Sequence, residues 1–190
     1  IGSVRPRRVL TRGGARPGDE VWVSGDIGAA AAGLQSLAAG EPGSPDMAAC
    51  RAAFLRPRPR VRLGALLGRN RAATSCIDLS DGLADGLHQI AASSGAGVEV
   101  DGRAVPILPA ASAWFEARGK DPLLEAAAGG DDYELLFTVG PKGRGAFSAV
   151  RRQAGGVRLT RIGVVRAGSG VSLRRGGAAE PLPSGFEHFQ

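Results

Sequence analysis

The stretch Cys76-Ile77-Asp78-Leu79-Ser80-Asp81-Gly82-Leu83 marks the point where a strand gives way to a helix, and it decides the fold class. The small and apolar residues at 72–77 predict a covered strand. Beyond them, apolar residues recur at spacings of three and four, as on one face of a helix that Gly95 can end. These residues are Leu79, Leu83, Leu87, Ile90 and Ala91. We therefore expect Asp78 at the carboxyl end of the strand, with Ser80 and Asp81 in the first turn of the helix.

Asp78, Ser80 and Asp81 have two interpretations. Open α/β sheets bind ligands at the carboxyl ends of their strands, and the free N–H groups of a first helical turn favour phosphate. Carboxylates in such a place suit Mg²⁺, which keeps several waters and bridges to substrate phosphates. The simpler alternative is helix capping, because Ser and Asp are common N-cap residues. The spacing alone leaves both interpretations open.

Length and composition indicate one domain. The chain has 190 residues, of which 43% are hydrophobic, enough to bury a core. No apolar run reaches membrane-spanning length, and no signal peptide is visible. Cys50 and Cys76 lie in apolar surroundings, which predicts buried, reduced thiols and a cytoplasmic location. The chain begins at Ile1 without an initiator Met, so we interpret it as a fragment that lacks upstream sequence.

The net charge of +6 raises the question of nucleic-acid binding. Only Lys120 and Lys142 are lysines among 24 basic residues, and a GC-rich genome produces such an arginine excess by codon usage alone. Aromatic residues make up 5% of the chain, few for stacking on bases, and no zinc-finger spacing occurs. We interpret the arginine–proline run at 56–60 as a solvated, extended link between two helices. Nucleic-acid binding is therefore the less favoured class.

The periodicity of the remaining chain predicts a mixture of strands and helices. Further strands are expected at 20–24, 98–100 and 133–139, and a hairpin of 162–165 with 171–174 around Gly168-Ser169-Gly170. Helices are expected at 27–39, 44–55, 60–67, 111–118, 122–128 and 146–153. This order favours an α+β fold with α/β/α layers, in which helices flank a mixed β-sheet.

Two glycine-containing segments are candidates for phosphate binding. Ser24-Gly25-Asp26-Ile27-Gly28 follows a strand and opens a helix, but it matches neither the Walker nor the Rossmann pattern, so a tight turn is the simpler interpretation. Gly129-Gly130-Asp131-Asp132-Tyr133 places two acids directly before a strand. Such acids repel each other unless they are solvated or paired with a cation. If they face a ligand, they need a positive partner.

Together these motifs resemble the C-terminal domain of the thiamine-monophosphate kinase family, which belongs to the aminoimidazole ribonucleotide synthetase superfamily. The resemblance covers essentially the whole chain, in order. The matching segments are Leu10-Thr11-Arg12, Gly14 to Asp19, Leu55-Arg56-Pro57-x-Pro59-Arg60, Ile77 to Leu83, Gly129 to Leu135, and Gly185-Phe186-Glu187-His188-Phe189.

The resemblance implies an enzyme that transfers the γ-phosphoryl group of ATP to thiamine monophosphate, with Mg²⁺ as cofactor and ATP as co-substrate. It implies that residues 1–190 form the single C-terminal domain of a two-domain kinase whose N-terminal metal-binding domain is absent from this chain. It also implies that the complete enzyme is a cytoplasmic homodimer, and that this chain alone is a monomer without activity. Its partners are small molecules, with neither nucleic acid nor membrane involved.

The resemblance also implies roles for six residues. Asp78 and Asp81 would bind Mg²⁺, Arg12 and Ser80 would bind ATP, and Asp131 and Phe186 would bind thiamine monophosphate. Some relatives have Glu at the position of Asp131, and Tyr or Trp at that of Phe186. No catalytic base is implied, because a phosphate acceptor is largely ionised at neutral pH and its phosphorylation depends on positioning and charge neutralisation.

Several alternatives stay open at this point. Arg12 is otherwise an ordinary surface arginine and Phe186 a core residue, while His88 is interpreted as part of a solvated helix face. For the whole chain, two other functions stay open. It is part of another ATP-dependent enzyme of the same superfamily, or it is a basic nucleic-acid-binding module.

Overall fold

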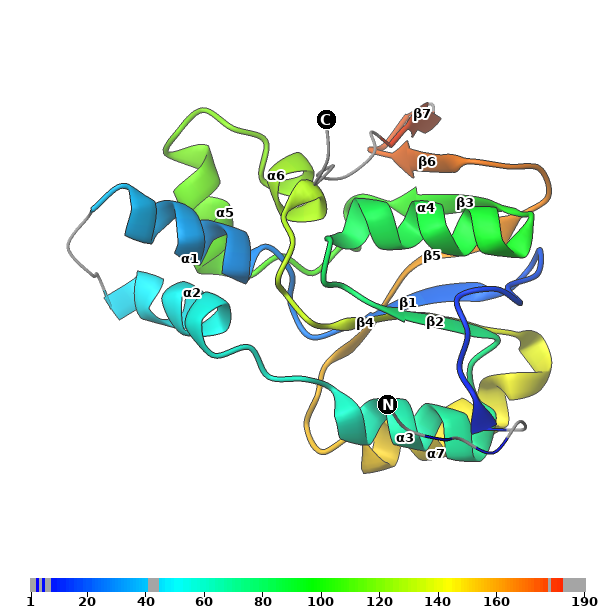
Figure 1. The fold of residues 1–190 in the computed structure, drawn as a ribbon. Helices are drawn as coiled ribbons and strands as arrows, with labels where there is room; N and C mark the ends of the chain where they lie inside the picture. The colour runs from blue at the N-terminus through cyan, green and yellow to red at the C-terminus, as the bar shows by residue number, and fades with distance from the viewer. Residues whose placement is uncertain (1–2, 4, 6–7, 41–44, 178, 183–190) are drawn as a thin grey trace.

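The computed structural model describes residues 3, 5, 8–40, 45–177 and 179–182 (Figure 1). In this part of the chain, seven strands form one mixed sheet with the order β2-β4-β1-β5-β3-β6-β7. The strands are β1 (Glu20–Ser24), β2 (Ser75–Asp78), β3 (Gly97–Asp101), β4 (Leu135–Val139), β5 (Leu159–Arg166), β6 (Val171–Arg174) and β7 (Ala179–Pro181). Neighbouring strands are antiparallel except β3 and β6, which are parallel.

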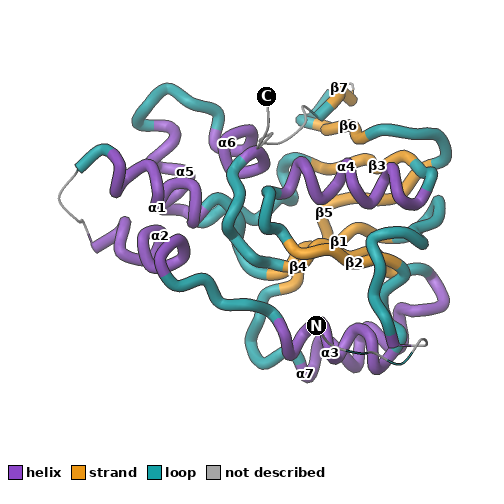
Figure 2. Tube along the Cα trace, viewed as in Figure 1, coloured by secondary structure: helices purple, strands orange, loops and turns teal. Residues whose placement is uncertain are grey.

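The helices lie in three groups around this sheet (Figures 1 and 2). They are α1 (Ala29–Ala38), α2 (Pro45–Leu55), α3 (Val61–Asn70), α4 (Leu83–Ser94), α5 (Pro109–Glu116), α6 (Pro122–Ala128) and α7 (Arg144–Gln153). Helices α3 and α7 pack together on one face of the sheet, and α4 packs on the other. Helices α1, α2, α5 and α6 contact one another beyond one end of the strands. The expected layered α+β architecture is therefore confirmed.

Side-chain alternation along the central strands produces the layers. In β4, Leu136 joins the core under α4, whereas its neighbour Phe137 joins the core under α3 and α7. This is the two-residue period of a strand that is covered on both faces. On the second face, Phe147 of α7 packs edge-on against Trp22 and Phe137, with ring centroids 4.8 Å and 5.6 Å apart. The sheet thus separates two hydrophobic cores.

The sequence locates the elements well but errs at the start of α4. Strand β1 and helix α6 have the expected bounds, and α4 ends as expected at Gly95, which adopts a left-handed conformation with φ 61°. However, α4 begins only at Leu83, with Gly82 as its N-cap residue. Ser80 and Asp81 therefore lie in the loop before the helix rather than in its first turn.

The expected hairpin of 162–165 with 171–174 is wrong. Strand β3 lies between β5 and β6, so β6 pairs with β3 and with β7, a strand that the periodicity did not reveal. The loop from β5 to β6 passes the start of β3 at Gly97, where a Cβ atom would lie 3.5 Å from the Ala167 carbonyl oxygen. This loop therefore crosses the start of β3 and places β6 on its far side, where β6 pairs with β3 in parallel.

Both cysteines are free thiols, as expected. Cys50 is fully buried and Cys76 is half-buried. Burial raises the pKa of Cys50 to about 11 and that of Cys76 to about 12, so neither is a reactive thiolate at neutral pH. Among the described helices, none combines the length and the hydropathy that crossing a membrane requires.

Candidate functional site

Three chain segments meet at one end of the strands β1, β4 and β2. Strand β4 lies between the other two and is antiparallel to both. The turn that follows β1, the segment that precedes β4 and the loop that follows β2 therefore come together at the same end. These are residues 25–28, 129–134 and 79–82, the glycine-containing motifs that the sequence singles out.

The loop after β2 and the segment before β4 run side by side through backbone hydrogen bonds. The Leu79 N–H donates to the Glu134 carbonyl oxygen at 2.8 Å, and the Tyr133 N–H donates to the Leu79 carbonyl oxygen at 3.0 Å. The Asp131 N–H donates to the Ser80 carbonyl oxygen at 2.8 Å. The fold therefore brings together Ser80 and Asp131, which the resemblance assigns to different ligands.

Glycines in both motifs permit this close approach. At Gly82, with φ 96°, a Cβ atom would lie 2.7 Å from the Gly129 carbonyl oxygen. At Gly130, a Cβ atom would lie 2.6 Å from the Ser80 carbonyl oxygen. Real Cβ atoms do not approach backbone oxygens so closely, so any larger residue at either position would push the two segments apart.

The segment before β4 has an unusual backbone. Asp131 and Tyr133 have φ values of 67° and 50°, in the left-handed region that residues other than glycine seldom adopt. Such conformations cost free energy and persist only where the surroundings hold them in place. They also explain why β4 begins at Leu135 and not, as the alternation predicted, at Tyr133.

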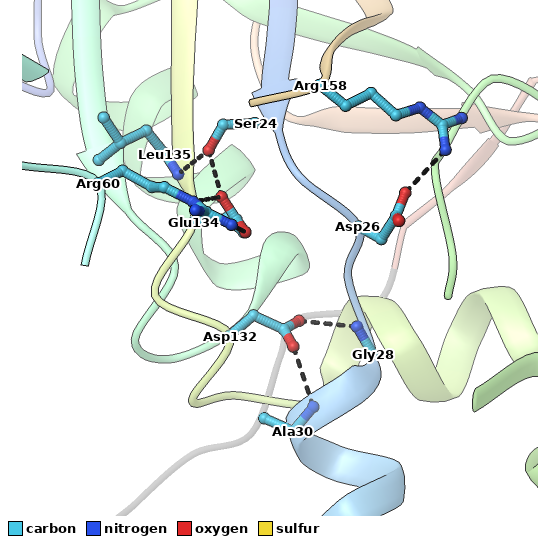
Figure 3. Close-up of polar contacts among 9 residues, drawn as sticks. All are labelled: Ser24, Asp26, Gly28, Ala30, Arg60, Asp132, Glu134, Leu135 and Arg158. Atoms are coloured by element: carbon cyan, nitrogen blue, oxygen red, sulfur yellow. Dashed lines mark hydrogen bonds and ion pairs between the residues drawn. The ribbon is translucent and has the colours of Figure 1, made fainter. Parts of the chain in front are cut away.

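Asp132 anchors this segment to the start of α1 (Figure 3). Its carboxylate accepts hydrogen bonds from the Gly28 N–H at 2.8 Å and the Ala30 N–H at 3.2 Å. Burial raises the pKa of Asp132 to about 7, although the two N–H groups act in the opposite direction. The sequence called for a positive partner for Asp131 and Asp132. For Asp132, this partner is the N-terminus of α1.

Glu134 forms a second anchor. The residue is 5% exposed, and its side chain accepts hydrogen bonds from the Ser24 Oγ at 2.5 Å and the Arg60 Nε at 2.6 Å. The Arg60 Nη2 donates to the other carboxylate oxygen, which makes the ion pair bidentate. The Ser24 Oγ also accepts from the Leu135 N–H at 2.9 Å. We call Ser24, Arg60 and Glu134 the Glu134 network.

Contrary to the prediction from the sequence, the arginine–proline link at 56–60 is not wholly solvated, because Arg60 is partly buried. Residues 56–59 are exposed, as predicted, but the Arg60 side chain turns inward to Glu134. The hydrogen bond to Glu134 raises the pKa of the Arg60 guanidinium, which stays charged in any case. One of the five residues of this run is thus part of the structure around the site.

The two expected metal ligands lie at the end of β2 and in the following loop. Asp78 is exposed and stands opposite Leu135 in the sheet register, and Asp81 is half-buried next to Gly82. Within the described residues, no group of three or more acids, histidines or cysteines is arranged to hold a metal ion. Two carboxylates nevertheless fit Mg²⁺, which often binds through one or two acids and takes its other ligands from water and substrate phosphates.

The structure weakens the capping interpretation of this loop. The N-cap position of α4 belongs to Gly82, so Ser80 and Asp81 both lie before it. Arg12 is exposed and donates to the Gln89 side chain of α4, and Gln89 in turn donates to Asp85 at 2.5 Å. These contacts place Arg12 beside Gln89, in the middle of α4.

Two residues singled out in the sequence remain, Phe186 and His88. Phe186, the expected substrate-binding aromatic residue, lies outside the described residues. His88 is half-buried, and its Nε2 lies 3.0 Å from the Leu182 carbonyl oxygen, so its helix face is not simply solvated.

The sequence did not reveal the Glu134 network or the capping role of Asp132. Arg60 and Glu134 are 74 positions apart, and Asp132 and Gly28 are 104 apart. The available signals were the two adjacent acids before a strand and the last arginine of the 56–60 run. Neither signal identifies its partner without the fold.

A comparison with known families defines the class of protein. Residues 16–176 match the family described as AIR synthase related protein, C-terminal domain, and the chain belongs to this family.

The curated proteins to which the chain is similar include thiamine-monophosphate kinases. The enzyme of Escherichia coli K12 is 38% identical over 194 residues, an alignment that covers 99% of this chain and 58% of the relative. Among solved structures, the thiamine-monophosphate kinase of Stenotrophomonas maltophilia K279a superposes with a TM-score of 0.79 at 36% identity, covering 90% of this chain and 54% of that one. AaThiL complexed with AMPPCP and TMP superposes with a TM-score of 0.78 at 32% identity, covering 95% and 54%. The chain thus spans about half the length of the relatives it matches.

Proposed function

We propose that this chain is the C-terminal domain of a two-domain kinase that transfers the γ-phosphoryl group of ATP to thiamine monophosphate, forming thiamine diphosphate. The observation that carries the proposal is the backbone pairing of loop 79–82 with segment 129–134. It joins the motif of Asp78, Ser80 and Asp81 to the motif of Asp131 at one end of the sheet. The similarity to thiamine-monophosphate kinases, one of them complexed with AMPPCP and TMP, supports the choice of substrates.

The proposed roles follow from the chemistry of the side chains. Asp78 and Asp81 would hold Mg²⁺, which when bound supplies neutralising charge for phosphate oxygens. Ser80 and Arg12 would contact ATP, the first through its short polar side chain and the second through its positive charge. Asp131 and Phe186 would contact thiamine monophosphate, the ring of Phe186 offering a flat apolar face to a cationic heterocycle.

No side chain of this site has to remove a proton from the acceptor. The acceptor is a phosphate, whose second pKa near 6 leaves it largely ionised at neutral pH. Catalysis then depends on the alignment of the two phosphates and on charge neutralisation. We accordingly assign no general base in this chain.

The remaining parts of the proposal concern the whole protein. An N-terminal domain would supply further metal-binding acids, so the 190-residue chain alone would be inactive. The complete enzyme would be a cytoplasmic homodimer whose partners are its small-molecule substrates, without nucleic acid or membrane.

The test is an assay of the complete protein, encoded by the uninterrupted reading frame, beside the 190-residue chain. With ATP, Mg²⁺ and thiamine monophosphate, we expect the complete protein to form thiamine diphosphate, detected by chromatography, and the chain alone to form none. ATP hydrolysis without thiamine diphosphate would favour another ATP-dependent enzyme of the superfamily. Turnover by the chain alone would contradict the need for a second domain.

A further inference from the structure

We propose that Arg60 and Glu134 are positioning residues that hold Asp131 in place for the phosphate acceptor. This inference rests on the proposed function. It assigns a role in substrate binding to an arginine that belongs to the arginine–proline link between α2 and α3, far from the acidic motifs in sequence.

Segment 129–134 is held on two sides by different kinds of contact. On one side, its backbone bonds to Leu79 and Ser80 of the loop after β2. On the other side, its side chains bond to the turn after β1, Asp132 to the backbone at Gly28 and Ala30, and Glu134 to Ser24. Figure 3 shows both side chains pointing to β1 and the start of α1. Asp131 directly precedes Asp132, and its own N–H donates to the Ser80 carbonyl oxygen, so its position depends on both sets of contacts.

Arg60 is the cation that completes the anchor at Glu134. It is the N-cap residue of α3, and α3 packs against α7 beneath the sheet, so the position of the guanidinium follows from the helix behind it. Two nitrogens of Arg60 bind the Glu134 carboxylate, and this geometry fixes direction as well as distance. Gly25 leaves room for the pair, because a Cβ atom there would lie 2.0 Å from the Glu134 Oε1.

The strained backbone explains why this anchor matters for Asp131 in particular. Asp131 and Tyr133 adopt left-handed conformations that the chain leaves when nothing holds them. Ser80 has independent support, because its loop is continuous with β2 on one side and α4 on the other. Loss of the Arg60–Glu134 pair would therefore displace the acceptor-side residue more than the nucleotide-side residue.

The first experiment compares Arg60→Met with Arg158→Met in the complete protein. Arg158 also pairs with an acid near the same end of the sheet, Asp26, at 2.8 Å, but its side chain is 61% exposed and the contact is single. We expect Arg60→Met to raise the KM for thiamine monophosphate at least tenfold and to change the KM for ATP less than twofold. Arg158→Met should leave both constants within twofold of the wild type. Equal effects of Arg60→Met on both substrates, or an effect no larger than that of Arg158→Met, would overturn the proposal.

A second variant separates positioning from folding stability. Arg60→Met alone leaves a buried carboxylate without its cation, which lowers stability, whereas Arg60→Met/Glu134→Met replaces both partners by apolar side chains of similar length. We expect the double variant to regain much of the melting temperature but to keep the raised KM for thiamine monophosphate. If the KM recovers together with stability, the pair is structural and the proposal is wrong. If the wild-type complete protein makes no thiamine diphosphate, the proposed function fails instead, which the same assay shows before any variant is compared.

Discussion

Substitution of Asp132 by Asn should change how the stability of this protein depends on pH. In the folded protein, burial raises the pKa of Asp132 to about 7, whereas Asp in an unfolded chain has a pKa of about 3.9. Between these two values the folded state binds more protons at this site than the unfolded state. Stability contributed by Asp132 is therefore present at low pH and is lost as pH rises from about 4 to about 7.

The size of the effect follows from the difference between the two pKa values. About three pKa units correspond to on the order of 4 kcal/mol over the whole window, and this is an upper limit because water partly reaches the side chain. Asn at position 132 keeps an oxygen near the Gly28 and Ala30 N–H groups but does not titrate. We therefore expect the unfolding free energy of the wild type, minus that of Asp132→Asn, to fall as pH rises from 4 to 7 and to level off above it.

Urea unfolding at pH values from 4 to 8 measures this difference directly. Other titrating groups are common to both proteins and cancel in the subtraction, apart from the nearby acids Asp131 and Glu134, which also raise the pKa of Asp132. A difference curve that is flat across the window would refute the reasoning. A curve that rises with pH would show that the helix N-terminus outweighs burial and lowers this pKa.

Three further predictions test other parts of the structure. Gly25→Ala should destabilise the fold by about 1–3 kcal/mol, because Gly25 has a φ of 61° and an added Cβ would collide with Glu134. The control Gly145→Ala lies in α7 with open space around it and should stabilise the fold by roughly 0.5 kcal/mol. Equal effects of the two substitutions in urea unfolding would contradict the packing described. In the complete protein, Asp81→Asn should lower turnover more than tenfold, with partial rescue by raised Mg²⁺ or by Mn²⁺ and little change in melting temperature. Normal turnover with a large loss of stability would make Asp81 structural. Phe186→Ala should raise the KM for thiamine monophosphate several-fold and leave that for ATP unchanged, since stacking contributes about 1 kcal/mol. A loss of roughly 3–5 kcal/mol in stability would instead identify Phe186 as a core residue.

The sequence by itself determined the elements and the motifs. Apolar periodicity and helix-ending glycines located β1, α6 and the end of α4 close to their observed bounds, because these signals act between residues a few positions apart. The same local patterns indicated α/β/α layers and identified the glycine and acid motifs at 78–82 and 129–133. The motifs also identified the family, because each motif and their order along the chain can be read from the sequence without the fold.

Only the tertiary structure decided the order of the strands and the partners of the buried charges. The placement of β3 between β5 and β6 depends on a loop that passes Gly97, and hairpin patterns carry no information about a strand from elsewhere in the chain. Likewise, the sequence predicted a solvated Arg60 and left open whether Asp132 is solvated or paired. Only folding brought Arg60 to Glu134 and Asp132 to the N-terminus of α1. Interactions of this kind depend on distance in space, and a buried charge is tolerated only where the fold brings an opposite charge or a free N–H group to it.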